Sequence, residues 1–89
     1  MIWKVEVLPT ARRALRQLPA GLREEILEIL QSLEDDPFDG ALRLYGREDY
    51  YRIRHGAYRV IFRVSIEKRS VLVARIARRS SAYEGYTPL

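Results

Sequence analysis

The sequence predicts a single small α+β domain in which one β-sheet packs on a pair of helices. Apolar and polar residues alternate over residues 2–8 and again over three segments between residues 50 and 78. Two segments with helical periodicity lie between them. Because a chain of 89 residues supports one hydrophobic core, we expect one domain over residues 1–89.

The first strand is predicted over residues 2–8, IWKVEVL, where Trp3, Val5 and Val7 share the face expected to be buried. Pro9 ends this strand. Thr10 follows it and is a candidate N-cap for the first helix.

Two helices are predicted next, separated by Pro19 and Gly21. The first follows apolar residues at helical spacing from Ala11 to Leu18. The second has a longer apolar stripe and ends before Asp35-Asp36-Pro37; its stripe contains Leu22, Ile26, Ile29, Leu30 and Leu33. So short a break predicts a helical hairpin. Residues 37–49 show no period and are predicted to form a loop.

Three further strands are predicted over about 50–55, 57–65 and 70–78. Their connections are the His55-Gly56-Ala57 corner and the charged Glu67-Lys68-Arg69 turn. Connections this short join neighbouring antiparallel strands, so the three strands form a meander.

Side chains alternate across a strand, so residue parity assigns the two faces of this meander. One parity is apolar and is predicted to be the core face: Ile53, Val60, Phe62, Val64, Leu72, Ala74 and Ile76. The other parity is predicted to be open to solvent, and it carries six arginines: Arg52, Arg54, Arg59, Arg63, Arg75 and Arg79.

The charge is distributed unevenly along the chain, with the positive charge in the second half. Residues 1–40 carry five basic and eight acidic side chains, a net charge of −3, whereas residues 41–89 carry eleven and four, a net charge of +7. Like charges on neighbouring strands repel, so the arginine face calls for an anion. Nucleic-acid phosphate is one candidate, and an acidic protein segment is another. A solvated face whose arginines pair with carboxylates is the third, although the second half holds few carboxylates.

Several classes of protein are disfavoured by composition. The chain has no cysteine, which excludes disulfides and cysteine-ligated zinc. Its start, MIWKVEVL, lacks the character of a signal peptide, and no apolar run approaches the roughly 18 residues of a membrane span. We therefore expect a cytoplasmic protein with no membrane partner.

The string YYRIRHGAYRVIFRV, preceded by Leu44-Tyr45-Gly46 and followed by RIARRSSAY, resembles the RelE/ParE superfamily of bacterial and archaeal toxins of type II toxin–antitoxin systems. The resemblance covers essentially the whole chain and is closest to the RelE-like branch. It implies the RelE-like fold, whose order of elements matches the order predicted above.

The resemblance implies a function as well. RelE-like toxins are metal-independent endoribonucleases that cut messenger RNA, many of them in the ribosomal A site, and so arrest translation and growth. In their reaction the RNA 2′-hydroxyl attacks the adjacent phosphate, and no cofactor is needed. ParE-like toxins instead inhibit DNA gyrase by binding it, and this is the alternative function. A third interpretation is an RNA-binding module, or an inactive member of the family.

Individual roles follow only from the resemblance. Arg59 matches the family's phosphate-stabilising arginine, and Arg79 matches the arginine assigned to the transition state or leaving group. Tyr83 matches a tyrosine that stacks on a base or moves a proton. Arg52 and Arg54 occupy positions where the best-known RelE toxins carry lysines. The remaining arginines of this region are expected to bind RNA phosphates: Arg63, Arg75 and Arg78.

These arginines do not supply a general base, because arginine does not release its proton in proteins. Tyr83 is one candidate. His55, the sole histidine, is another, since histidine exchanges protons near neutral pH. The alternative for His55 is an exposed turn residue.

The resemblance also implies partners. A cognate, RelB-like antitoxin is expected to cover the arginines with an acidic segment, and oligomerisation is expected mainly through that antitoxin. Messenger RNA and the ribosome are the expected targets.

Overall fold

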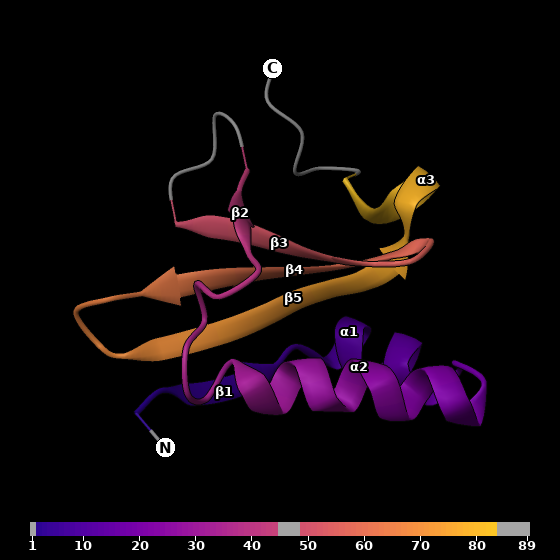
Figure 1. Cartoon of the computed structure of the whole chain (residues 1–89), viewed down its shortest axis with the longest axis horizontal. Helices are drawn as coiled ribbons and strands as arrows, with labels where there is room; N and C mark the ends of the chain where they lie inside the picture. The colour runs from indigo at the N-terminus through magenta and orange to yellow at the C-terminus, as the bar shows by residue number, and fades with distance from the viewer. Residues whose placement is uncertain (1, 45–48, 84–89) are drawn as a thin grey trace.

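The computed structural model describes residues 2–44 and 49–83, which form a sheet with a helical hairpin on one face and a short helix on the other (Figure 1). This confirms the predicted α+β class. The elements in chain order are β1 (Lys4–Val7), α1 (Pro9–Arg16), α2 (Ala20–Ser32), β2 (Leu42–Arg43), β3 (Tyr50–His55), β4 (Tyr58–Ser65), β5 (Ser70–Arg78) and α3 (Arg79–Ala82).

The sheet has five strands in the order β1-β5-β4-β3-β2. The antiparallel meander β3-β4-β5 is confirmed. The first strand pairs with the last one in parallel, with Val5 beside Val71. Strand β2 was not predicted; it has two residues, within the expected loop, and lies antiparallel to β3 with Leu42 beside Arg52.

The helical hairpin is confirmed, with a shifted start. Helix α1 begins at Pro9, and Leu8 occupies its N-cap position, so Thr10 is a helical residue and not the cap. Proline suits the first turn of a helix, because the backbone N–H that it lacks would have no partner there.

The main core lies between the hairpin and the sheet. Its largest fully buried side chains include Phe62, Ile26 and Leu33, each with 0% exposure. The predicted contributors from β1 and the residues before it are partly buried and pack against this core: Trp3, Val5 and Val7. Burial of these apolar side chains is the main source of the domain's stability.

One stretch of the predicted core face is wrong. Ile61 pairs with Arg75, but Phe62 pairs with Val73, so the register skips Ala74. Such a bulge adds one residue to one strand and reverses the alternation beyond it. Val71 and Val73 therefore enter the core, and Leu72 pairs with Arg63 on the other face and is half-buried.

The second face of the sheet, opposite the helical hairpin, was predicted to be open to solvent, but it is partly covered. Helix α3 lies over it (Figure 1). Ala82 of α3 forms a small second core with Ile61 and Leu44, against which Tyr50, Ala77 and Tyr83 pack. None of the helices in the described ranges is long and apolar enough to cross a membrane.

Candidate functional site

Strand pairing gathers the predicted arginines into rows on the second face. Arg54 of β3 lies directly opposite Arg59 of β4. In the next row Ile61 lies between Arg52 and Arg75. The alternation of β3 and β4 was predicted correctly, so the sequence placed Arg52, Arg54 and Arg59 on the same face.

Helix α3 brings the C-terminal part of the motif to the same end of the sheet. The backbone N–H of Arg79 donates to the carbonyl of Ala57 at 2.7 Å. Beside this contact, Ala57, Arg78, Arg79 and Ser80 line a shallow pocket of about 250 Å³. Tyr83, at the other end of α3, packs against the second core. Two segments distant in the sequence thus meet at the 55–58 corner.

Arg59 is buried, although its position on the second face predicted solvent exposure. Its side chain is 4% exposed. Its Nη1 donates to the carbonyl of Gly56 at 2.8 Å and to that of Tyr58 at 2.7 Å. The guanidinium therefore folds back onto its own corner and lies beneath the surface.

The positive charge at this corner is only partly compensated by its neighbours in the described ranges. Within the described ranges Arg59 has only carbonyl partners, and neither Arg59 nor Arg54 forms an ion pair. A buried cation is costly to desolvate unless an opposite charge or hydrogen bonds compensate. The two carbonyls supply part of that compensation, and the net positive charge of the Arg54–Arg59 pair remains available to an anion.

Two other predicted phosphate ligands lie further from this corner. Arg63 is four residues along β4 from Arg59, about 13 Å away at the rise of a strand, and its Nη2 lies 3.9 Å from Oδ2 of Asp49. Arg75 lies between them on β5 and is half-buried. The second face therefore carries a cluster of arginines at the 55–58 corner and further cations away from it.

Arg78 does not join the cluster. Its guanidinium lies 5.5 Å from the centroid of the Tyr58 ring, to which cation–π attraction draws it. The Tyr58 ring packs against the main core, on the helical side of the sheet. The parity of β5 explains this, because Arg78 and Ile76 share a face.

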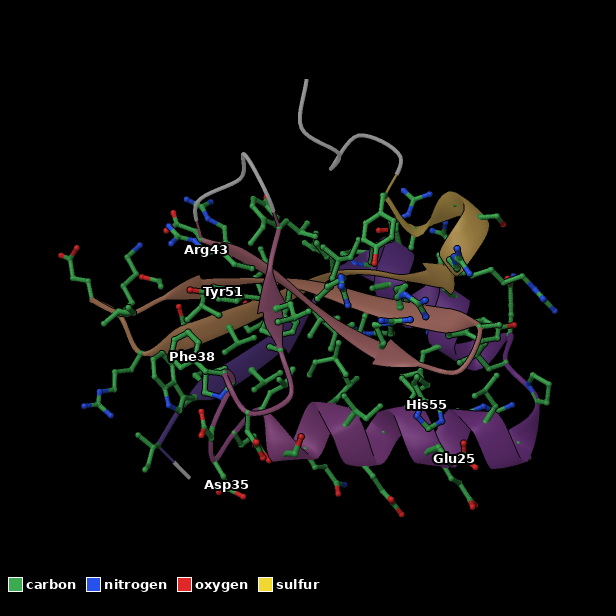
Figure 2. All side chains as sticks on the ribbon, turned by 45° about the horizontal axis from the view of Figure 1, so that its top comes forward. Glu25, Asp35, Phe38, Arg43, Tyr51 and His55 are labelled. Atoms are coloured by element: carbon green, nitrogen blue, oxygen red, sulfur yellow. The ribbon has the colours of Figure 1, made fainter. Side chains whose placement is uncertain are left out.

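His55 also turns away from the arginines. Its Nε2 lies 2.6 Å from Oε1 of Glu25 on α2, and the two side chains point toward one another between the sheet and the helix (Figure 2). This geometry argues against His55 as the general base and leaves Tyr83 as the candidate. It also differs from the simple exposed turn residue considered above.

Three backbone groups were missed by sequence reasoning: the carbonyls of Gly56 and Tyr58, which accept from Arg59, and that of Ala57, which accepts from Arg79. No side-chain pattern signals a carbonyl acceptor, so only the fold identifies them. The Tyr45-Gly46 part of the motif used for the resemblance lies outside the described residues.

The sequence of this chain is similar to those of known toxins. The family model described as the ParE toxin of the type II toxin–antitoxin system parDE matches residues 5–83. The protein described as putative toxin RelE1 of Methanocaldococcus jannaschii is 30% identical over 89 residues, which cover 94% of this chain and 98% of that protein.

Chains in solved toxin–antitoxin structures have a similar fold. The archaeal RelE–RelB complex from Pyrococcus horikoshii contains a chain that is 30% identical, with a TM-score of 0.78, over 92% of this chain and 100% of that one. The toxin–antitoxin complex RelBE2 from Mycobacterium tuberculosis contains one that is 28% identical, with a TM-score of 0.77, over 89% of this chain and 100% of that one.

Proposed function

Because the chain belongs to the RelE/ParE superfamily of toxins of type II toxin–antitoxin systems, we propose that it is a RelE-like endoribonuclease that cleaves messenger RNA and so inhibits translation. The second face of the sheet, at the 55–58 corner, is the proposed site of cleavage.

One observation supports this proposal above the others. A buried guanidinium with no carboxylate partner in the described part of the chain lies directly opposite a second, exposed arginine, Arg54. Like charges in this position destabilise the free protein. A site that gathers cations without anions is suited to bind phosphate, whose negative charge offsets the repulsion.

The proposed reaction is attack of an RNA 2′-hydroxyl on its own 3′-phosphate, which forms a 2′,3′-cyclic phosphate and releases the 5′-oxygen of the next nucleotide. Arg54 and Arg79, both exposed, contact the phosphate oxygens, and Arg52 supports them. Arg59 adds its charge from beneath. Cations held in place where negative charge develops stabilise the transition state. The Tyr83 hydroxyl is the proposed proton relay: it gives its own proton to the departing 5′-oxygen and takes up the proton that the 2′-hydroxyl loses, and no metal takes part.

The remaining cations of the second face serve RNA binding in this proposal. Arg63 and Arg75 bind phosphates that flank the scissile one. Arg78, held on the Tyr58 ring, is the least suited of the three predicted phosphate ligands.

The proposed partners follow from the relatives, whose structures are toxin–antitoxin complexes of RelE with RelB. We propose that a RelB-like antitoxin neutralises the same arginines with an acidic segment and mediates oligomerisation. The free toxin would act in the cytoplasm on messenger RNA at the ribosome.

A second candidate function is inhibition of DNA gyrase by binding, as for ParE-like toxins. Two observations favour it. Residues 52 and 54 are arginines and lack the proton-transfer capacity of lysine. His55, the other candidate base, is held by Glu25 on the helical side. In this case the arginine cluster would be a protein-docking surface.

The experiment that separates the functions is induced expression of the toxin alone in a bacterial host. RNA 5′ ends and 2′,3′-cyclic phosphate ends are mapped, and plasmid supercoiling is measured in the same cells. Arg79→Ala is the inactive variant of choice, because Arg79 is exposed and lies outside both cores. Arg16→Ala is the matched control, since Arg16 is an exposed arginine on α1.

New cyclic-phosphate ends inside coding sequences, present with the toxin and with Arg16→Ala and absent with Arg79→Ala, would support the ribonuclease. Growth arrest with intact messages and altered supercoiling would contradict it and favour gyrase binding. RNA binding without either effect would identify an RNA-binding module or an inactive enzyme.

A further inference from the structure

The corner at the end of the β3–β4 hairpin connects the two arginines to which the family resemblance assigns chemistry. His55 and Tyr58 form the last pair of the hairpin, so Gly56 and Ala57 are its two loop residues. Gly56 has a φ of 57°, a positive value of the kind that two-residue hairpin turns require and glycine accepts without strain. The loop is therefore tight, and its carbonyls leave the strand ladder.

Both loop carbonyls are bound by those arginines. The carbonyl of Gly56 accepts from Nη1 of Arg59 at 2.8 Å. The carbonyl of Ala57 accepts from the backbone N–H of Arg79 at 2.7 Å. The side chain of one arginine and the main chain of the other thus hold neighbouring peptide groups of one turn.

The Arg59 side chain is bound to the turn at two points. Its Nη1 carries two protons, and they are donated to the carbonyls of Gly56 and Tyr58, one on each side of Ala57. With 4% exposure, the side chain has little surface left for a ligand. A planar guanidinium bound at two points on the same turn restrains that turn strongly.

Helix α3 has few attachments in the described part of the chain. It has four residues and no side-chain cap at its N-terminus, and so short a helix does not hold its position by itself. Its described attachments are the Arg79–Ala57 hydrogen bond at its start and the packing of Ala82 and Tyr83 on the second core at its end.

From these contacts we infer that Arg59 is a positioning residue: it fixes the turn so that the Ala57 carbonyl holds Arg79, and α3 presents Arg79 and Tyr83 in register with Arg54. The catalytic consequence rests on the proposed ribonuclease function, whereas the structural coupling does not. If Arg59 served only to attract phosphate, its removal would leave the Arg79 hydrogen bond of the RNA-free protein unchanged.

The test is the hydrogen-exchange rate of the Arg79 amide, measured by NMR in RNA-free protein. Arg59→Met removes the charge and the donors but keeps much of the buried volume. We expect Arg79 exchange to accelerate by about tenfold or more, as for loss of a charge-assisted hydrogen bond. The Leu8 amide, bonded to the Val73 carbonyl at 2.9 Å, reports on the β1–β5 side of the sheet and should stay unchanged. Arg16→Met is the control for removal of an arginine elsewhere.

Gly56→Ala provides an independent perturbation that leaves every arginine in place. The added Cβ meets no atom within 4 Å, but the positive φ is strained for alanine. We expect faster Arg79 exchange here too, together with a fall in kcat of about tenfold or more at nearly constant KM for a short RNA, because the catalytic groups are misplaced and not removed.

Unchanged Arg79 exchange in folded Arg59→Met would overturn the inference. If that variant loses Leu8 protection as well, the fold has failed; Gly56→Ala then decides the part of the inference that couples the turn to Arg79, because unchanged Arg79 exchange there would overturn it. If the unsubstituted protein cleaves no RNA, the proposed function fails, but the exchange rates still decide whether Arg59 positions Arg79.

Discussion

Arg54→Gln should stabilise the free protein while it weakens RNA binding. Arg54 faces Arg59 directly across the β3–β4 ladder, and neither forms an ion pair in residues 2–44 and 49–83. Like charges directly opposite on neighbouring strands destabilise a sheet by about 0.2–1 kcal/mol. Because Arg54 is exposed and solvent screens it, we expect its removal to raise the free energy of unfolding by about 0.5 kcal/mol at low salt.

Urea denaturation followed by Trp3 fluorescence measures this change, at low salt and again at about 1 M salt, where the Debye length falls to about 3 Å and the gain should largely disappear. Binding to a non-cleavable RNA carrying a 2′-deoxynucleotide is measured over the same salt series. Loss of one phosphate contact should reduce the slope of log K against log salt by about one.

Arg16→Gln is the control with the opposite expected sign. Arg16 lies in the last turn of α1, where a cation is favourable beside the helix C-terminus, so its removal should not stabilise the fold or change the RNA salt slope. If Arg54→Gln destabilises the protein, or stabilises it equally at both salt concentrations, the argument from charge repulsion is refuted.

Three further predictions concern single side chains. Phe62→Ala should lower the free energy of unfolding by about 3–5 kcal/mol, because Phe62 is fully buried and stacks on Tyr51 with ring centroids 6.0 Å apart; a loss below about 1 kcal/mol in urea denaturation would contradict that burial. His55→Gln should leave cleavage nearly unchanged and cost up to about 1 kcal/mol, since its half-exposed pair with Glu25 lies on the helical side; a fall in cleavage rate of about a hundredfold would restore His55 as the base. Tyr83→Phe should slow single-turnover cleavage but keep RNA affinity, and an unchanged rate would leave Tyr83 a stacking or packing role only.

The sequence determined those features that depend on local chemistry. Alternation and helical periodicity act over a few residues, so they identified β1, the helical hairpin and the meander β3-β4-β5. Because parity is continuous along β3 and β4, the alternation also placed four arginines on one face: Arg52, Arg54, Arg59 and Arg63. The candidate site was therefore predictable as a set of residues: parity along the last strand also selected Arg79, and the family resemblance added Tyr83.

The tertiary structure decided which of these residues meet and what covers them. The skipped residue at Ala74 depends on how β4 and β5 pair, and it reversed the expected positions of Leu72 and Val73. Arg59 is buried with its side chain bound to carbonyls of its own turn, and the orientation of His55 depends on Glu25, thirty residues away. The β4–β5 register and the His55–Glu25 contact join distant segments, so local propensity does not encode them. The bonds of Arg59 are local, but they depend on the shape of the turn, which the pattern of side chains does not reveal.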